Sequence, residues 1–181
     1  STPDCQLHRT HTTEMITPAD LIIIGAGPGG YETAAEAAAE GLSVVLIEKS
    51  ELGGTCLNRG CIPTKTLCRS AQVVQDVREA ALFGVEIDNY RPDYTVAAHR
   101  KDEVVRRLRE GVAMAVGKCT VVEGEARFAD AHTVVVGEEA YTAPKIIIAT
   151  GSSPARLPIP GADTAIDSDA FLELTQLPQS V

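Results

Sequence analysis

Tryptophan is absent from this sequence, and aromatic residues make up only 4% of its 181 residues. So low an aromatic content leaves no platform on which nucleic acid bases could stack. The chain carries 16 Lys and Arg against 25 Asp and Glu, and this net charge of −9 repels a phosphate backbone. No apolar run approaches the roughly 20 residues of a membrane span. We therefore expect neither a nucleic acid nor a membrane as a partner.

Cysteine is also scarce, with five residues in the chain. A small secreted protein held together by disulfides would contain more, so the count favours the reduced thiols of a cytoplasmic protein. We expect no metal site, because neither a second cysteine pair nor a histidine lies at zinc-ligand spacing. Cys5, Cys68 and Cys119 have no partner at a useful spacing and are predicted to be free.

The first residues differ from the rest of the chain. Residues 1–14 are polar, carry Asp4 and Glu14, and lack the apolar core of a signal peptide. We predict a mobile leader over 1–14, in which His8 and His11 are solvated side chains rather than metal ligands.

The next residues predict a β-α-β unit. Residues 21–24 are fully apolar and rich in Ile, residues 31–40 are rich in Ala and Glu, and residues 43–48 form a second apolar run. Gly41 would end the helix. A unit of this length makes its two strands parallel.

Further elements follow along the chain. Two amphipathic helices are expected over 66–83 and 94–116, and the mixed charges of the second are interpreted as a solvated face. Short strands of a small antiparallel β-meander are expected over 120–122, 126–128, 133–136 and 140–142, followed by a buried strand over 145–149, a loop over 152–161 and helical turns over 169–175. The predicted fold is α/β, with a parallel sheet in a domain over 15–151 and a connecting segment over 152–181.

A nucleotide-binding pattern occupies the first turn of this unit. Gly25, Gly27 and Gly30 fit G-x-G-x-x-G between a strand and a helix, the context that a Rossmann-like dinucleotide site requires. Glu48 closes the second strand, where a carboxylate accepts hydrogen bonds from ribose and repels a 2′-phosphate. FAD or NAD is therefore favoured over NADP. The alternative is that the glycines serve packing alone and Glu48 is a surface residue.

Two cysteines lie close together after this unit. Cys56 and Cys61 are five residues apart, and a regular helix would separate them by a rise of about 7.5 Å, too far for a disulfide. A bond between them needs irregular backbone, which Asn58 and Gly60 permit. Pro63 suits a first helical turn, so Cys61 is expected near a helix N-terminus with Lys65 on the same face. The alternative is a pair of unpaired, buried thiols.

Residues 53–65, GGTCLNRGCIPTK, resemble the redox-active disulfide signature of the FAD-dependent pyridine nucleotide–disulfide oxidoreductases. The resemblance extends over residues 18–181. The Leu-Asn-x-Gly-Cys-Ile-Pro-x-Lys form is most similar to enzymes that oxidise dihydrolipoamide, whereas glutathione and mercuric reductases more often carry Val at positions 57 and 62. A glutathione or mercuric reductase-like enzyme and a non-catalytic FAD-binding fragment remain the alternatives.

The resemblance implies a role for each motif residue. Cys56 and Cys61 would form the redox disulfide, with Cys61 beside the flavin and Cys56 meeting the substrate. The residues implied in FAD binding are Gly25, Gly27, Gly30, Glu48, Gly54, Thr55, Lys65, Gly124, Ala126, Thr150 and Gly151. Arg59 stands where many relatives have an apolar residue, and the sequence assigns it no role.

The resemblance also implies an activity and its partners. The enzyme would oxidise dihydrolipoamide, free or on a lipoyl-bearing protein, with NAD as the final acceptor, and would act as a homodimer. A second G-x-G-x-x-G, which would bind NAD, does not occur in these 181 residues. The chain is therefore expected to be the N-terminal part of such an enzyme, truncated before the NAD domain and incomplete for turnover.

Overall fold

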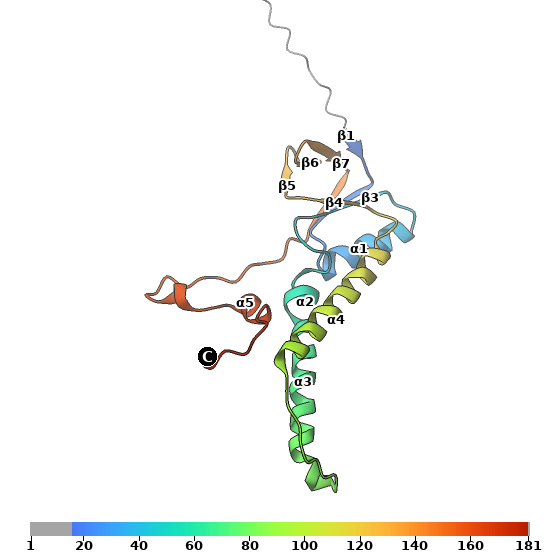
Figure 1. Ribbon diagram of the computed structural model, residues 1–181. Coiled ribbons are helices and arrows are strands. Elements are labelled where there is room, and N and C mark those ends of the chain that lie inside the picture. Colours follow the sequence, from blue (N-terminus) through green and yellow to red (C-terminus); the bar gives the residue numbers. More distant parts are fainter. Residues whose placement is uncertain (1–15, 181) are drawn as a thin grey trace, which may run out of the picture.

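The computed structural model describes residues 16–180, as one body with a long helical arm (Figure 1). The predicted leader over 1–14, with Cys5, His8 and His11, lies outside the described residues. The elements are β1 (Ile16–Pro18), β2 (Leu21–Ile24), α1 (Pro28–Ala39), β3 (Val44–Glu48), α2 (Gly54–Arg59), α3 (Cys61–Glu79), the 3-10 turn η1 (Ala80–Phe83), α4 (Tyr94–Ala115), β4 (Thr120–Glu123), β5 (Ala126–Phe128), β6 (Thr133–Val136), β7 (Glu139–Thr142), β8 (Lys145–Ile148), the 3-10 turn η2 (Ala162–Thr164) and α5 (Ser168–Leu172).

A four-stranded parallel sheet in the order β4-β3-β2-β8 forms the centre of the body. Its two inner strands are buried on both faces, and Ile22, Ile23 and Leu46 expose none of their surface. The predicted β-α-β unit with parallel strands is thus confirmed. Helix α1 begins at Pro28, earlier than expected, because proline suits the first turn of a helix. It ends just before Gly41, whose φ is +92°.

The second sheet has the order β1-β7-β6-β5 and contains the predicted antiparallel meander in β5, β6 and β7. One predicted member was wrongly placed: residues 120–122 belong to β4, which pairs with β3 at the edge of the parallel sheet. Val122 packs there into the apolar cluster between the two sheets, and its burial favours the pairing of β4 with β3. Strand β1, which was not predicted, pairs in parallel with β7.

Strand β8 was expected to be buried, and this expectation is wrong. It pairs only with β2, at the other edge of the parallel sheet, and Ile148 leaves 65% of its surface exposed. The run of three isoleucines predicted the strand correctly, but it does not indicate whether the strand lies inside the sheet or at its edge.

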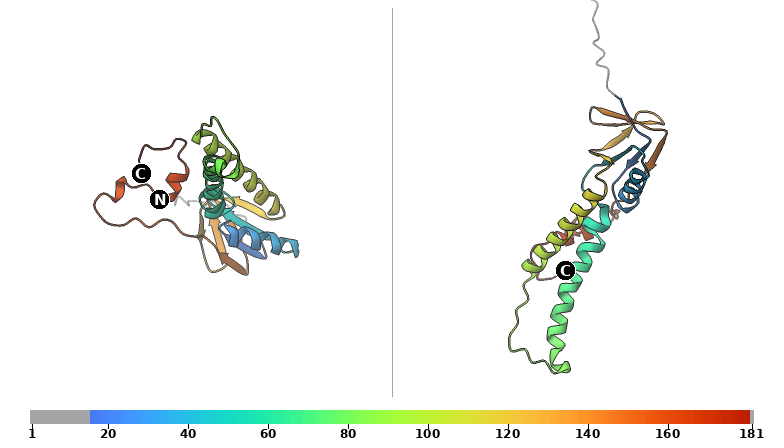
Figure 2. Two further views of the ribbon diagram at one scale, coloured as in Figure 1. Left: turned by 90° about the horizontal axis from the view of Figure 1, so that it is seen from below. Right: turned by 90° about the vertical axis from the view of Figure 1, so that its right-hand side faces the viewer.

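Helices α3 and α4 lie side by side and extend away from the sheets as an arm (Figures 1 and 2). Helix α3 begins at Cys61, before the predicted residue 66, and α4 matches the expected bounds closely. The predicted apolar side of α3 is covered only near its root, because Leu82 and Phe83 at the tip are 82% and 80% exposed.

The chain after β8 leaves the body and returns as α5, which lies beside α2 (Figure 1). Leu172 is the buried residue of α5. The helical turns predicted over 169–175 begin one residue earlier, at Ser168. Within residues 16–180, none of the helices has the length and apolarity needed to cross a membrane.

Candidate functional site

The first glycine loop, residues 25–30, joins β2 to α1 by a turn that leaves no room for side chains at Gly25 and Gly30. Gly25 has a φ of +102°, and a Cβ on it would lie 2.3 Å from the carbonyl oxygen of Ala149. A Cβ on Gly30 would lie 1.8 Å from the carbonyl oxygen of Gly25. Both positions therefore require glycine for the sharp turn and for close packing of helix on strand.

A second glycine loop, residues 52–54, contacts the first. A Cβ on Gly54 would lie 2.5 Å from the Cα of Gly27, and the φ of Gly54 is +62°. The amide of Gly53 donates a hydrogen bond to the carbonyl of Ala26 at 2.8 Å. The two loops thus present bare backbone next to the N-terminus of α1, which no side chain caps. Such an arrangement is suited to an anionic group.

Glu48 ends β3 with its carboxylate turned toward the first glycine loop. One carboxylate oxygen accepts a hydrogen bond from the amide of Ala26 at 2.7 Å, and the other accepts from the amide of Ser50 at 2.9 Å. These bonds fix the orientation of the carboxylate. The second of these oxygens also accepts from the Ser50 hydroxyl at 3.2 Å, whereas the oxygen bonded to Ala26 keeps a lone pair that can accept a hydrogen bond from a ligand.

Several expected cofactor residues gather at the carboxyl ends of the parallel strands. Gly25 follows β2, Glu48 ends β3, Gly124 follows β4 and Thr150 follows β8. The amide of Gly124 donates to the carbonyl of Glu48 at 2.9 Å, and the Cα of Thr150 would lie 3.1 Å from a Cβ on Gly25. This edge of a parallel sheet is where ligands of such folds bind. Gly151 is the next residue after Thr150 and has a φ of +67°.

Ala126 and Thr55 are among the expected residues that lie outside this group. Ala126 begins β5 and pairs with Val136 in the meander. Thr55 lies in the first turn of α2 with its side chain exposed, directly after the second glycine loop.

Cys56 and Cys61 lie on either side of a break between two helices. Helix α2 ends at Arg59, Gly60 adopts φ −138° and ψ −110°, and α3 begins at Cys61. The irregular backbone expected between the cysteines is therefore located at Gly60, and Cys61 is at a helix N-terminus as predicted. Gly60 is tightly enclosed, since a Cβ on it would lie 2.9 Å from the carbonyl oxygen of Thr55.

The two sulfurs are neighbours and are present as free thiols. The hydrogen bond with Cys61 raises the pKa of the Cys56 thiol, partial burial raises it further, and the positive charge of Lys65 opposes both. Cys61 and Lys65 are exposed, and Cys56 is half-buried. The alternative of unpaired, buried thiols is wrong in its burial, because Cys61 is exposed and Cys56 only half-buried, and the disulfide between them stays a prediction. Cys68 and Cys119 are also free thiols, as predicted.

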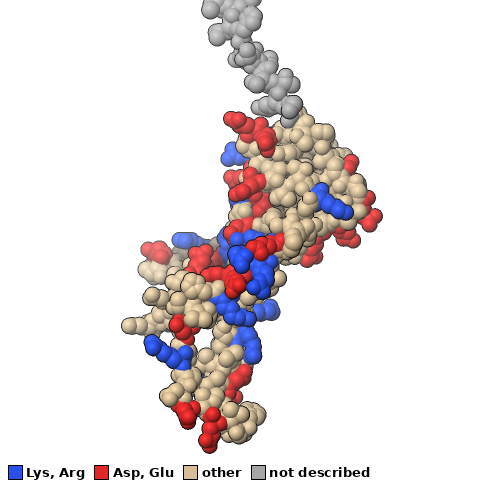
Figure 3. Space-filling view, turned by 45° about the vertical axis from the view of Figure 1, so that its right-hand side comes forward, with Lys and Arg blue, Asp and Glu red and all other residues tan. Residues whose placement is uncertain are grey.

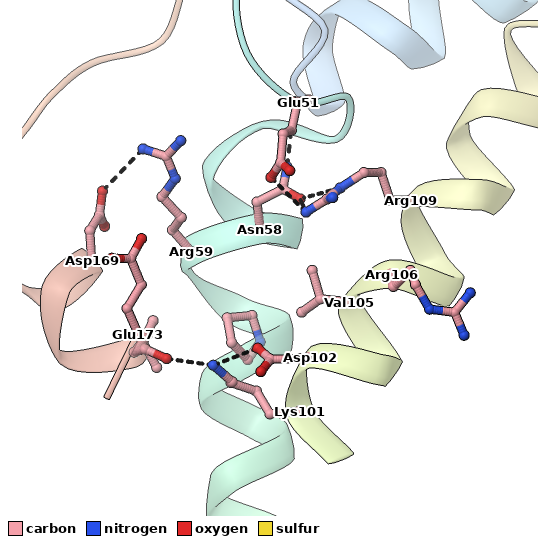
Figure 4. Close-up of a pocket in the computed structure, with 12 residues that line it drawn as sticks. Glu51, Asn58, Arg59, Lys101, Asp102, Val105, Arg106, Arg109, Asp169 and Glu173 are labelled. Carbon is pink, nitrogen blue, oxygen red and sulfur yellow. Dashed lines mark hydrogen bonds and ion pairs between the residues drawn. The ribbon is translucent and has the colours of Figure 1, made fainter. Parts of the chain in front are cut away.

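A polar network behind the cysteines was missed by the sequence analysis. Arg109 of α4 reaches Asn58 and Glu51, Arg59 pairs with Asp169 of α5 at 3.7 Å, and Lys101 is buried (Figure 4). Figure 3 shows basic and acidic side chains mingled where the arm meets the body. The interpretation of the α4 charges as one solvated face is therefore wrong at Lys101 and Arg109, whose partners come from distant parts of the chain.

These residues line a hollow of about 420 Å³ between α2, α4 and α5. Lys101 donates to the carbonyl of Leu172 at 2.6 Å and pairs with Asp102 at 2.8 Å. Among residues 16–180, no group of three or more His, Cys, Asp or Glu side chains could hold a metal ion.

Comparisons with known proteins agree with this geometry. The family model described as "Pyridine nucleotide-disulphide oxidoreductase" matches residues 19–181. The dihydrolipoyl dehydrogenase of Chlamydia muridarum is 42% identical over 171 residues, which is 90% of this chain and 37% of that protein. A dihydrolipoyl dehydrogenase of Bacillus subtilis is 40% identical over 171 residues, or 89% of this chain and 37% of that protein.

The structure is also similar to a solved one. The Cu(II) complex of the HOCl-induced flavoprotein disulfide reductase RclA from Escherichia coli superposes with a TM-score of 0.73 at 35% identity, covering 88% of this chain and 34% of that one. This chain thus spans little more than a third of the length of these relatives.

Proposed function

Because this chain belongs to the pyridine nucleotide-disulphide oxidoreductase family, we propose that it is the FAD-binding, thiol-bearing part of an enzyme that oxidises dihydrolipoamide with NAD. The observation that carries the proposal is the contact of the Cys56 and Cys61 thiols at a helix break. The finer assignment to dihydrolipoamide rests on the similarity to dihydrolipoyl dehydrogenases.

The residues present fit FAD. The backbones of Gly27 and Gly54 approach so closely that a Cβ on Gly54 would lie 2.5 Å from the Cα of Gly27, and this bare backbone adjoins the uncapped N-terminus of α1, as a pyrophosphate requires. Glu48 would hold the adenosine ribose through the carboxylate oxygen that accepts only from Ala26. Lys65 and Thr55 would lie toward the flavin and its ribityl chain. Gly124, Ala126, Thr150 and Gly151 would contact the rest of the cofactor.

The sulfur chemistry begins with the oxidised pair, a Cys56–Cys61 disulfide. A thiolate of dihydrolipoamide attacks the sulfur of Cys56, a mixed disulfide forms, and Cys61 leaves as a thiolate. The second thiolate of the substrate then attacks the substrate sulfur that is bonded to Cys56. This closes the lipoamide ring and releases Cys56 as a thiolate. Two electrons have moved to the cysteine pair, and the two substrate protons pass to Cys56 and to solvent. When bound, FAD would supply a two-electron acceptor for the cysteine pair and a hydride donor for NAD.

The raised pKa of Cys56 is consistent with this division of roles. Cys56 holds a proton more firmly than an ordinary thiol, chiefly because of its hydrogen bond with Cys61. Cys61, at the N-terminus of α3, would face the acceptor. We further expect the full-length enzyme to be a cytoplasmic homodimer that receives its substrate on a lipoyl-bearing protein.

Tryptic mapping tests the cysteine pair directly, because cleavage at Arg59 separates Cys56 from Cys61 and cleavage at Lys65 separates both from Cys68. The chain is equilibrated at several ratios of lipoamide to dihydrolipoamide, alkylated and digested. We expect the peptides of residues 50–59 and 60–65 to become linked by a disulfide as the ratio rises, with Cys68 alkylated throughout. Absence of the linked peptide at every ratio contradicts the proposal, and Cys68→Ser is the matched control.

Reduction of the isolated Cys56–Cys61 disulfide tests the substrate. Dihydrolipoamide is expected to reduce it faster than glutathione at equal thiol concentration, since the second thiol of the mixed disulfide is already attached. Faster reduction by glutathione would contradict dihydrolipoamide and favour a glutathione reductase-like enzyme.

Titration with FAD tests the cradle, with flavin fluorescence as the measurement. Gly54→Ala places a Cβ against the Cα of Gly27 and should weaken binding, whereas Gly84→Ala, which also has a positive φ but open space around it, should not. Equal binding by both variants would remove Gly54 from the FAD site.

A further inference from the structure

Asn58 is the second-last residue of α2 and lies between the two cysteines in sequence. Its side-chain amide donates hydrogen bonds to the carbonyl of Leu52 at 2.9 Å and to the carbonyl of Gly54 at 3.1 Å. Both acceptors belong to the second glycine loop. Asn58 thus fastens the helix that carries Cys56 onto the loop that precedes it.

Arg109 completes this arrangement from α4. Its guanidinium donates to the Asn58 side-chain oxygen through Nε at 3.0 Å and through a terminal nitrogen at 2.8 Å, and that nitrogen also donates to Glu51 at 2.6 Å (Figure 4). Because arginine only donates, it holds the Asn58 oxygen toward α4 and leaves the amide nitrogen facing the loop carbonyls. Glu51 balances the charge. Each polar atom of the Asn58 side chain is therefore used.

Helix α2 needs such support because it has only six residues. A helix that short is not stable by itself, and Leu57 is its one buried side chain. The second glycine loop is in turn docked on the first through Gly53 and Gly54. The contacts of Asn58 and Arg109 therefore connect the helix of Cys56 to the glycine loops on one side and to the arm on the other.

We propose that Asn58 and Arg109 are positioning residues that fix the Cys56 sulfur next to Cys61 and so favour closure of the disulfide. The role rests on the proposed function, because it presupposes that the pair is redox-active. Neither side chain takes part in the exchange. Loss of either would leave the thiols present but would lower the effective concentration of one for the other, which displaces the dithiol–disulfide equilibrium toward the dithiol.

The test measures the fraction of disulfide-linked tryptic peptide in the full 181-residue chain, equilibrated at a series of ratios of oxidised to reduced glutathione, each of which sets one redox poise. Asn58→Ala and Arg109→Gln are expected to lower the oxidised-to-reduced ratio at a given poise by about threefold or more. Arg109→Lys keeps one donor for the Asn58 oxygen and should give an intermediate ratio. Arg106→Ala is the control, because Arg106 lies on the same helix, points away from Asn58 in Figure 4 and pairs only with exposed Glu110.

The outcomes separate the two proposals. A wild-type chain that forms no disulfide overturns both the proposed function and this role. A wild-type chain that forms it, with Arg109→Gln and Asn58→Ala equal to wild type, overturns only the positioning role. An equal displacement in Arg106→Ala also overturns it, as a general effect of lost charge. If Asn58→Ala does not fold, Arg109→Gln and Arg109→Lys, at a side chain one-third exposed, decide the matter.

Discussion

The sheets and the helical arm use their apolar residues in opposite ways. In the parallel sheet, Ile22, Ile23 and Leu46 are completely buried between layers that the chain itself supplies. At the tip of the arm, Leu82 and Phe83 are almost as exposed as in an extended chain. The arm is fixed only at its root, where Leu57, Val105 and Val112 form a small cluster beside the polar network. The thiol pair lies at this junction, so a well-packed region and a sparsely packed one meet at the cysteines.

The largest effect is expected in the first glycine loop. Gly30→Ala forces a Cβ to within 1.8 Å of a backbone oxygen and should lower the free energy of unfolding by about 4 kcal/mol. Gly29→Ala is the matched control in the same helix, because its Cβ meets nothing within 4 Å. Urea unfolding measures both. Similar losses in the two variants would mean that the loop is not closely packed.

The next effect compares the two regions directly. Ile23→Ala removes a fully buried side chain and should cost about 3 kcal/mol, whereas Leu82→Ala at the arm tip should change stability by less than about 0.5 kcal/mol. Both are measured by urea unfolding of the 181-residue chain. A large loss of unfolding free energy in Leu82→Ala would show that the arm tip is covered in solution. The contrast between the buried sheet and the exposed arm would then be wrong.

A smaller and more local effect is expected at Lys101. Lys101→Met keeps most of the aliphatic stem but removes the donor to the Leu172 carbonyl, at an expected cost of about 1.4 kcal/mol. Hydrogen exchange of the α5 amides should then be roughly tenfold faster, with the β2 and β3 amides unchanged. The exposed Lys118→Met is the control. Unchanged α5 exchange would mean that the Lys101 hydrogen bond does not help to hold α5.

The smallest effect on stability is expected at the junction itself. Cys61→Ala removes the main cause of the raised pKa of Cys56, so the pH dependence of Cys56 alkylation should move to lower pH. Lys65→Gln removes the opposing positive charge and should move it to higher pH. Neither change should alter unfolding by more than about 0.5 kcal/mol. A profile that stays in place in Cys61→Ala would mean that the two thiols do not interact.

The β-α-β unit and the cysteine motif were predictable because local patterns carry them. Four apolar residues, a glycine turn and an alanine-rich helix are sufficient to predict parallel strands at residues 21–24 and 43–48. The cysteine spacing required a backbone break, and Gly60 supplies it. The roles of these residues in binding FAD and exchanging electrons remain predictions.

The errors arose where position depends on distant residues. Nothing in an apolar run distinguishes an inner strand from an edge strand, so β8 was predicted to be buried and β4 was assigned to the meander. Likewise, nothing in the sequence distinguishes Arg109 from the other arginines of its charged helix. Only the tertiary fold brings it to Asn58, which lies 51 residues earlier in the chain. Long-range polar contacts have no periodic signature.

The placement of β8 has a consequence for biosynthesis. One neighbour of β2, strand β3, follows it after a single helix, whereas its other neighbour, β8, is formed by residues 145–148, far later in the sequence. The two edges of β2 are therefore paired at very different times during translation. The β2-α1-β3 unit can assemble as soon as it leaves the ribosome, whereas the β8 side of β2 stays unpaired until residues 145–148 have been made. A nascent chain stalled before residue 145 would therefore offer that bare strand edge to chaperones.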